Sequence, residues 1–366
     1  MQKILLTSQS ELKINALKQF LDEKGIQYEL TIVNCDGCNL PPQPFIDTDH
    51  DGFYYPKERM NYAAKSYNLN NYDYVVAIES GIRCFKDVFS KDLFLDVSYV
   101  LILHQGILSK GWEGTYPIPG WEGTYPIPKE YLQKLFNQKL INYNDHMQGY
   151  PITIGELIHQ DKPYINPKNW FNTRPEQINS SLTACFQDLI KNIQSKNELL
   201  TVYKSYDNYP KPGVNFHDIF PLFKNPKVFK KMIDFMVQRY KYDQIDYVIG
   251  LESRGFVLGT PLAYELGIGF VPVRKAGKLP GEVIQISYGK EYGVDVCEMQ
   301  KDIPKGSRVL LVDDLIATGG SLQAAVDLCQ QLNCEIVDCC VLREVKELRE
   351  KCQKTMKKYY TVLLQE

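Results

Sequence analysis

Short apolar runs followed by segments with apolar residues at helical spacing recur along the 366-residue chain. The clearest pairs are residues 3–7 then 12–21, residues 247–251 then 256–266, and residues 309–312 then 322–332. A short apolar run before an amphipathic segment is typical of a buried strand and the helix that covers a mainly parallel sheet. The pattern therefore predicts an α/β architecture in both halves of the chain.

The length of the chain suggests two domains. Residues 192–208 are largely polar, although residues 199–202 are apolar enough for a short leading helix. Pro210, Pro212 and Gly213 then force an extended turn. We place the boundary between residues 194 and 195, which gives domains of residues 1–194 and 195–366.

Composition narrows the class of protein. The chain has 42 Lys and Arg against 44 Asp and Glu, so no overall field marks it as a nucleic-acid or membrane-surface binder. The first apolar run is too short for a signal peptide, and no segment is expected to span a bilayer. Ten scattered cysteines fit free thiols in a reducing cytoplasm.

Cys35 and Cys38 have the spacing of half a zinc site or of a redox pair. No second pair completes a tetrahedral shell, and no helical pattern follows as a thioredoxin-like motif requires. We therefore favour an ordinary turn.

A perfect tandem repeat occupies residues 111–119 and 120–128, each reading GWEGTYPIP. Its prolines and glycines exclude a helix and disfavour a central strand, and two copies are too few for a solenoid. We interpret it as a duplicated loop. The second copy runs into an amphipathic helix that begins near Lys129, so we expect that copy to pack and the first to bulge outward.

The strongest chemical signal is the run VLLVDDLIATGGS at residues 309–321. A buried strand ends at two carboxylates, and a loop of small residues opens a helix whose N-terminal amides favour a dianion. Two carboxylates accept hydrogen bonds from vicinal ribose hydroxyls, so the implied ligand is a sugar phosphate; the alternative is an ordinary Asp-Asp turn. The candidate ligand-binding residues are Asp313, Asp314, Ala317, Thr318, Gly319, Gly320 and Ser321.

This run resembles the phosphoribosyl pyrophosphate motif of type I phosphoribosyltransferases, and the resemblance extends over the C-terminal half. Residues 209–219 are similar to the purine-binding entry segment of adenine phosphoribosyltransferases, and residues 250–256 are similar to the second strand-end loop of that family. The resemblance implies that Phe216 and Arg254 sandwich adenine and that the backbone of Asn215 reads its edge. An aromatic face and a planar guanidinium both stack on a heterocycle.

A basic loop at residues 274–281 suits a mobile cover over the pyrophosphate leaving group. Arg274, Lys275 and Lys278 of this loop are the candidates for binding the pyrophosphate. The resemblance implies a homodimer that shares this loop. Residues 287–293 match the family's hood loop, where Glu291 stands in the place of the group that handles the purine proton; Lys290 replaces a residue that is usually apolar.

In the N-terminal half, a hydroxyl-bearing loop with Thr7 and Ser8 precedes Lys13, which is a plausible triphosphate grip. Together with Lys57, Arg59 and the run at residues 74–82, residues 1–192 resemble the inosine/xanthosine triphosphatases, which act on non-canonical purine nucleotides. Residues 172–174 fit a later block of that family. The resemblance implies Mg²⁺ ligands at Glu79 and Asp36, with Asp73 a weaker third.

Both resemblances together imply a bifunctional purine enzyme that combines salvage with nucleotide sanitation. It would make AMP from adenine and phosphoribosyl pyrophosphate, hydrolyse ITP or XTP, and use Mg²⁺ in both domains. Two alternatives stay open: a transferase with an inactive structural N-terminal domain, and a regulator that binds phosphoribosyl pyrophosphate without turnover. The intact Glu291 and the absence of a DNA-reading segment argue against the regulator.

Overall fold

The computed structural model describes residues 1–47, 51–86, 92–114, 127, 129–167, 174–209, 212–213, 215–290, 293–357 and 360–364. The chain divides into two compact units, Met1–Lys191 and Asn192–Glu366. This division lies three residues before the predicted boundary. It falls inside helix α5 (Arg174–Val202), which is far longer than the leading helix expected at residues 199–202.

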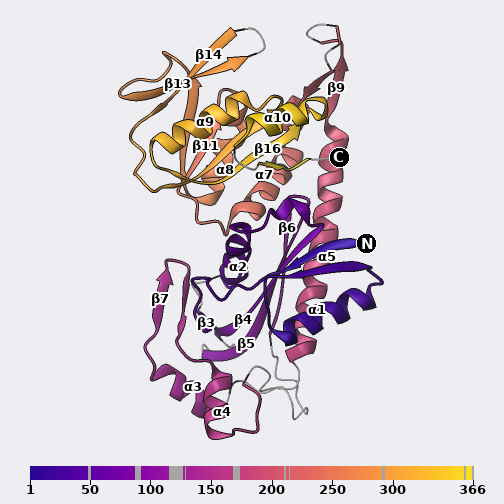
Figure 1. The fold of residues 1–366 in the computed structure, drawn as a ribbon, viewed down its shortest axis with the longest axis vertical. Coiled ribbons are helices and arrows are strands. Elements are labelled where there is room, and N and C mark those ends of the chain that lie inside the picture. Colours follow the sequence, from indigo (N-terminus) through magenta and orange to yellow (C-terminus); the bar gives the residue numbers. More distant parts are fainter. Residues whose placement is uncertain are drawn as a thin grey trace. The chain divides into compact units, whose positions relative to one another are not determined.

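The first unit contains an eight-stranded mixed sheet (Figure 1). Strand β1 pairs in parallel with β2 and β4, whereas β4, β5 and β6 pair antiparallel. The expectation of a mainly parallel sheet is wrong here, since the long strands β4, β5 and β6 are antiparallel neighbours. Gln105 and Gly106, both at positive φ, join β5 to β6 by a tight hairpin that leaves no room for a crossover helix. The strands are β1 (Gln2–Leu6), β2 (Tyr28–Ile32), β3 (Gln43–Ile46), β4 (Tyr74–Lys86), β5 (Asp92–His104), β6 (Ile107–Gly114), β7 (Ile141–Asn144) and β8 (Met147–Tyr150).

The helices of this unit present an apolar face to the core. Helix α1 buries Ala16, Leu17, Phe20 and Leu21, which recur at helical spacing on one face. Helix α4 begins with a capping box in which Thr153 and Glu156 exchange hydrogen bonds. The helices are α1 (Glu11–Glu23), α2 (Tyr54–Ala64), the 3₁₀ turn η1 (Leu69–Asn71), α3 (Lys129–Phe136), α4 (Ile154–Asp161) and α5.

The second unit is built on a seven-stranded sheet of order β13-β14-β12-β11-β15-β16-β17. Its central strands are parallel, as predicted, and β13 and β14 add an antiparallel edge. The strands are β11 (Tyr247–Leu251), β12 (Gly269–Lys275), β13 (Val283–Lys290), β14 (Gly293–Gln300), β15 (Arg308–Ile316), β16 (Glu335–Glu344) and β17 (Thr361–Val362), beside a separate ribbon of β9 (Lys204–Asp207) and β10 (Asn215–Asp218).

Helices α8 and α9 lie against this sheet (Figure 1). Leu310, Leu311 and Val312 of β15 are completely buried beneath them, as their apolar run predicts. The helices are α6 (Phe220–Lys224), α7 (Pro226–Tyr240), α8 (Arg254–Leu266), α9 (Gly320–Gln331), the 3₁₀ turn η2 (Lys346–Leu348) and α10 (Arg349–Thr355).

Most of the tandem repeat lies outside the described residues. The first four residues of its first copy end the edge strand β6, and Gly111 packs so closely on α5 that an added Cβ would lie 2.3 Å from the backbone nitrogen of Cys185. For these residues the expected outward bulge is wrong, because the missing side chain lets the strand approach the helix. Ile127 of the second copy is buried, as expected.

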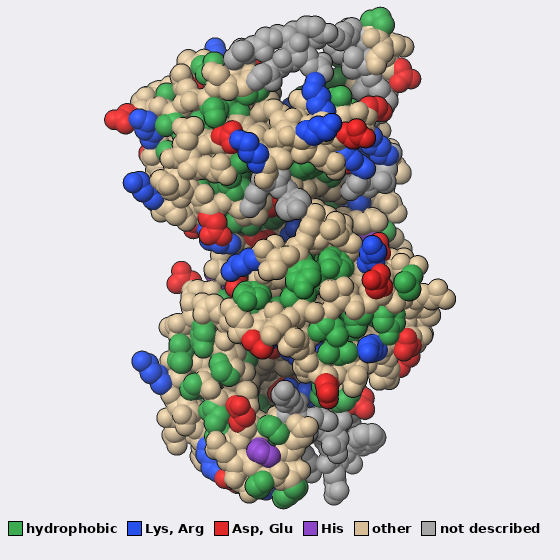
Figure 2. All heavy atoms as spheres, viewed as in Figure 1, with side chains coloured by type: hydrophobic (Ala, Val, Ile, Leu, Met, Phe, Trp, Pro, Cys, Tyr) green, Lys and Arg blue, Asp and Glu red, His purple; other side chains and the backbone are tan. Residues whose placement is uncertain are grey.

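All ten cysteines are described and are free thiols. Cys38 donates its backbone N–H to the carbonyl of Cys35 at 3.0 Å, so the pair forms the favoured turn. None of the helices in the described ranges is both long and apolar enough to cross a bilayer. On the face drawn in Figure 2, acidic and basic side chains are interspersed.

Candidate active site

The two predicted strand-end carboxylates lie within β15, which continues to Ile316. Asp314 donates its backbone N–H to Oδ1 of Asp313 at 2.9 Å, and its own Oδ2 lies 3.1 Å from Nε of Arg254 at the start of α8. Burial raises the pKa of both carboxyls, carrying that of Asp313 well above its usual range, while Arg254 opposes the increase at Asp314. Of the two carboxyls, Asp314 is thus the one that contacts a guanidinium.

The predicted phosphate cup lies directly after these carboxylates. Gly319 has φ of +82° and precedes Gly320, the first residue of α9, and as the N-cap residue it offers no side chain to the N-terminal amides of this helix. Ala317 and Thr318 form the half-buried connection, and Ser321 hydrogen-bonds through Oγ to the hydroxyl of Tyr288 at 3.3 Å. Amides at an uncapped helix start suit an anion.

The basic loop is tied to its surroundings by carboxylates. Arg274 donates from Nε and Nη2 to Glu252 at 3.3 and 3.2 Å, and the N–H of Lys275 donates to Glu252 Oε2 at 3.0 Å. These hydrogen bonds lower the pKa of Glu252, and the bond from the Arg274 side chain has the largest effect. Lys275 and Lys278 expose their side chains, whereas the Arg274 guanidinium is already engaged.

The contacts that Phe216, Arg254, Asn215 and Glu291 are expected to make with the purine stay predictions. Phe216 is half-buried in β10 and packs edge to face on Tyr209, with ring centroids 5.2 Å apart. Asn215 lies opposite Asp207 in the same ribbon. Glu291 falls outside the described residues, and Arg254 turns its Nε toward Asp314.

Sequence reasoning missed two residues beside this site. The Arg343 guanidinium lies 4.8 Å from the ring centre of Tyr203, and Arg343 is buried near the end of β16. Burial raises the pKa of Tyr203, and the charge of Asp314 adds to the increase. Tyr203 carries no sequence signal. Arg343 does, because a charged residue ends an apolar strand, where it lies opposite Leu315 of β15.

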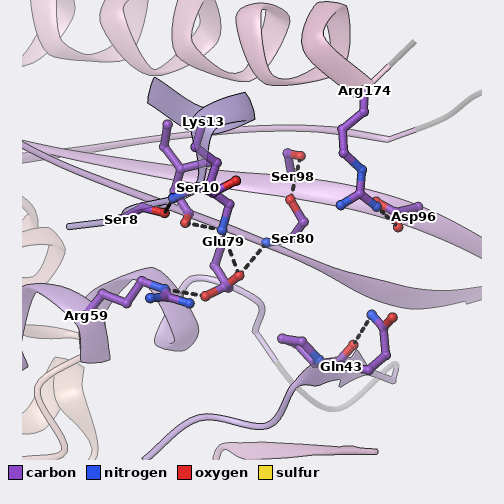
Figure 3. Close-up of polar contacts among 12 residues, drawn as sticks. Ser8, Ser10, Lys13, Gln43, Arg59, Glu79, Ser80, Asp96, Ser98 and Arg174 are labelled. Atoms are coloured by element: carbon purple, nitrogen blue, oxygen red, sulfur yellow. Dashed lines mark hydrogen bonds and ion pairs between the residues drawn. The ribbon is translucent and has the colours of Figure 1, made fainter. Parts of the chain in front are cut away.

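Two of the N-terminal candidate residues, Lys13 and Arg59, meet at a third, Glu79 of β4 (Figure 3). Lys13 of α1 donates to Glu79 Oε1 at 3.0 Å and to the carbonyl of Ile78 at 2.8 Å. Arg59 of α2 pairs with Oε2, and the backbone N–H of Ser80 donates to Oε1 at 3.0 Å. Two cations from two helices therefore converge on one buried carboxylate.

This convergence sets the charge of the cluster. Burial disfavours the ionised form of Glu79, but Arg59 and then Lys13 outweigh it and bring the pKa of Glu79 to about 2. Burial is also the main cause that lowers the pKa of Lys13 to about 8, against the attraction of Glu79. At neutral pH all three groups are charged, with one positive charge in excess.

The remaining N-terminal candidates lie apart or have other partners. Thr7 and Ser8 are buried at the end of β1, and Thr7 Oγ1 finds no hydrogen-bond partner among the residues that the structure describes. Lys57 is buried on α2, 4 % exposed. Asp36 is exposed, and Asp73 accepts the backbone N–H of Lys3 at 2.7 Å.

The predicted magnesium site is not assembled from protein carboxylates. Within the described ranges no group of three or more His, Cys, Asp or Glu is placed to hold a metal ion. Both oxygens of Glu79 already face cations, and Asp36 lies exposed to solvent. The donor set as found does not fit a resident Mg²⁺, which prefers carboxylate, water and phosphate oxygens.

A buried polar chain connects the Glu79 strand to α5. The hydroxyls of Ser80 and Ser98 lie 3.0 Å apart, and Ser98 donates to Gln177 at 3.3 Å. Gln177 in turn donates to the carbonyl of Asp96 at 2.7 Å, and Arg174 pairs with the carboxylate of Asp96. Burial raises the pKa of Asp96 to about 6, against Arg174. Sequence reasoning noted Arg174 only through resemblance and missed its partner.

Comparison with known proteins assigns the second unit. Residues 221–364 match the family model described as phosphoribosyl transferase domain, so this unit is of the phosphoribosyltransferase class. The chain is 46 % identical over 154 residues to adenine phosphoribosyltransferase of Sinorhizobium medicae, which covers 42 % of this chain and 86 % of that protein. The Kluyveromyces lactis enzyme of the same name is 49 % identical over 157 residues, 42 % and 84 % of the two chains. The chain belongs to the adenine phosphoribosyltransferase family.

A solved structure of adenine phosphoribosyltransferase from Saccharomyces cerevisiae, in complex with an imino-altritol bisphosphate and adenine, is 44 % identical to this chain. The match covers 47 % of this chain and 99 % of that one, with a TM-score of 0.45.

Proposed function

We propose that the second unit transfers the phosphoribosyl group of phosphoribosyl pyrophosphate to adenine, giving AMP and pyrophosphate. One observation carries this proposal for a chain of this family: buried Asp314, which pairs with half-buried Arg254 of α8, lies on the strand that leads into the start of α9. Carboxylates that accept hydrogen bonds from ribose hydroxyls are thereby followed along the chain by amides that donate hydrogen bonds to a phosphate of the same substrate.

The chemistry follows from these groups. A purine nitrogen attacks the anomeric carbon as pyrophosphate leaves, so the sugar acquires oxocarbenium character. Asp313 and Asp314 orient the ribose, and Lys275 and Lys278 balance charge on the leaving group. By family resemblance, Glu291 moves the purine proton and Phe216 stacks on the base. Mg²⁺ bound to the pyrophosphate would neutralise part of its charge, and the homodimer expected from the resemblance belongs to the same proposal.

The test uses the full chain with adenine, phosphoribosyl pyrophosphate and MgCl₂. We expect AMP and pyrophosphate in equal amounts, with hypoxanthine and guanine as control bases. Glu291→Gln should lower kcat far more than it raises either KM. Tight binding of phosphoribosyl pyrophosphate without any AMP would favour the regulator instead.

We further infer that the first unit hydrolyses non-canonical purine nucleoside triphosphates such as ITP and XTP. The observation in favour is the convergence of Lys13 and Arg59 on Glu79, with an excess of positive charge, and a second one is the buried hydroxyl of Thr7 after β1, which has no hydrogen-bond partner among the described residues. A triphosphate competes with Glu79 for the two cations and offers Thr7 an acceptor. Mg²⁺ is expected to arrive with the triphosphate as part of the substrate.

Site variants of the full chain separate the two activities. Arg59→Gln removes one of the two cations and should sharply lower ITP hydrolysis while leaving AMP synthesis intact, whereas Asp313→Asn combined with Asp314→Asn should do the reverse. Phosphate and pyrophosphate are measured separately to identify the product. A wild-type chain that releases neither from ITP or XTP, yet makes AMP, would mean that the first unit is structural.

A further inference from the structure

Glu298 is a buried carboxylate of β14 that faces the backbone of the basic loop. It is 1 % exposed, and its Oε1 accepts the backbone N–H groups of Lys278 and Leu279 at 2.7 and 2.8 Å. Its Oε2 accepts from Nε2 of Gln285, the residue opposite on β13, at 2.9 Å. A hydrogen bond from the Gly277 amide completes the set.

These donors keep Glu298 ionised. The Gly277 amide is the largest cause that lowers the pKa of Glu298, and burial opposes it. With the further hydrogen bonds from Leu279, Gln285 and Lys278, this pKa falls to about 2. The carboxylate has an acceptor for each donor, so the loop amides are satisfied without water. No neutral side chain offers the same set of acceptors.

The opposite side of the loop is held as well. Arg274 lies directly opposite Glu298 across β12 and β14, and its Nη1 donates to the carbonyl of Lys278 at 3.2 Å. Glu252 fixes Arg274 in turn. The backbone around Lys278 is therefore bound through both its amide and its carbonyl, while the exposed ammonium groups of Lys275 and Lys278 form no ion pair with any described residue.

We propose that Glu298 is a positioning residue for transfer: by fixing the amides of residues 277–279, it holds the Lys275 and Lys278 ammonium groups where the pyrophosphate of the substrate binds. This inference rests on the proposed transferase function. A loop whose backbone is already ordered loses less conformational entropy when it binds a polyanion. Glu298 touches neither substrate itself, so its effect should fall on phosphoribosyl pyrophosphate and spare adenine.

The test is a charge-swap pair. In Glu298→Gln, a carboxamide of the same size still accepts from the loop amides, but its N–H₂ meets the N–H₂ of Gln285. In the double variant E298Q/Q285E, the introduced amide can donate to the introduced carboxylate, which restores that bond. Glu282→Gln, at an exposed neighbour of the loop that pairs loosely with Lys301 at 3.7 Å, is the control.

We expect Glu298→Gln to raise KM for phosphoribosyl pyrophosphate about tenfold, the equivalent of one charge-assisted hydrogen bond, with KM for adenine within about twofold. The double variant should recover most of the loss, and E282Q should match wild type. Unchanged KM for phosphoribosyl pyrophosphate, or equal loss for both substrates without recovery, would overturn the role. Calorimetric Kd values for phosphoribosyl pyrophosphate give the same comparison without turnover. A wild-type chain that makes no AMP would refute the transferase function, and the Kd values of the variants would still show whether Glu298 positions the loop for binding.

Discussion

Nε of Arg254 lies 3.1 Å from Oδ2 of Asp314, and this ion pair joins the first residue of α8 to the strand that carries the carboxylates proposed to bind ribose. Asp314 is 2 % exposed, so its charge depends on this partner. The pair also gives Arg254 a second task beside the base stacking expected from family resemblance. Carboxylate and guanidinium therefore fix each other in the proposed site.

Replacing Asp314 by Asn tests this pair. The amide removes the negative charge that faces Arg254 and weakens the acceptors offered to the ribose, so we expect kcat/KM for AMP synthesis to fall about 10- to 100-fold, the range for losing a hydrogen bond to a charged group. Asp302→Asn, on an exposed turn of the same unit, is the control and should change nothing. Steady-state kinetics with both substrates varied provide the measurement; wild-type kcat/KM in the Asp314 variant would exclude the ribose-binding role.

Gly319→Ala tests the uncapped start of α9. Gly319 has φ of +82°, and an added Cβ would lie 3.0 Å from Cγ of Met356. Gly306 has the same φ, but an added Cβ there meets nothing within 4 Å. Both alanine variants should lower the free energy of unfolding by about 1–2 kcal/mol through backbone strain alone.

Only the Gly319 variant should also weaken phosphoribosyl pyrophosphate binding, because the added contact displaces the first amides of the helix. Urea unfolding and calorimetry on both variants separate the two effects. Equal binding by the Gly306 and Gly319 variants would show that these amides do not hold the phosphate.

Much of the fold could be predicted because buried positions recur in the sequence with the period of the helix or strand that they belong to. The apolar run at residues 247–251 became β11 without change, and the helix expected at residues 322–332 begins two residues earlier as α9. Strand direction left no such trace in the first unit. The antiparallel pairing of β5 and β6 depends on a two-residue turn at Gln105 and Gly106, which apolar runs do not encode.

The site was predictable where neighbours in sequence act together, as in the carboxylates and glycines of residues 313–321. Partners distant in sequence were not. Glu298 reaches the loop only because β14 pairs with β12 in one register, and Asp96 meets Arg174 across 78 residues. Contacts of this kind depend on tertiary packing and leave no local pattern.

The Lys13 pKa of about 8 predicts the alkaline limit of ITP hydrolysis. Lysine is cationic below its pKa, so the proposed phosphate grip should weaken as pH rises through 8, and kcat/KM should fall there. Lys13→Arg keeps its charge to far higher pH, so the fall in kcat/KM on the alkaline limb of the pH profile should move to higher pH. Lys18→Arg, exposed on the same helix, should leave the limb in place.

Stability should change in the opposite direction over the same range. The folded-state pKa of Lys13 lies below its ordinary value of 10.5, so between about pH 8 and 10.5 the unfolded chain binds more protons, and the Lys13 contribution to the free energy of unfolding rises with pH. Activity profiles and urea unfolding measured from pH 7 to 10 test both signs. A limb that Lys13→Arg does not move would assign the titration to another group.

Thr7→Val tests whether the buried hydroxyl at the end of β1 serves the triphosphate. A hydroxyl without a partner is costly to bury, so replacement by an isosteric apolar side chain should raise the free energy of unfolding by about 1 kcal/mol. The same change removes a donor to the phosphates and should lower kcat/KM for ITP about tenfold. Thr31→Val, half-buried on the neighbouring strand β2, is the control for the chemical change and should leave ITP hydrolysis unaltered. If the Thr7 hydroxyl only supported the fold, the Thr7→Val variant would lose stability and activity together. A variant that is more stable but slower would instead show that the hydroxyl serves the ligand.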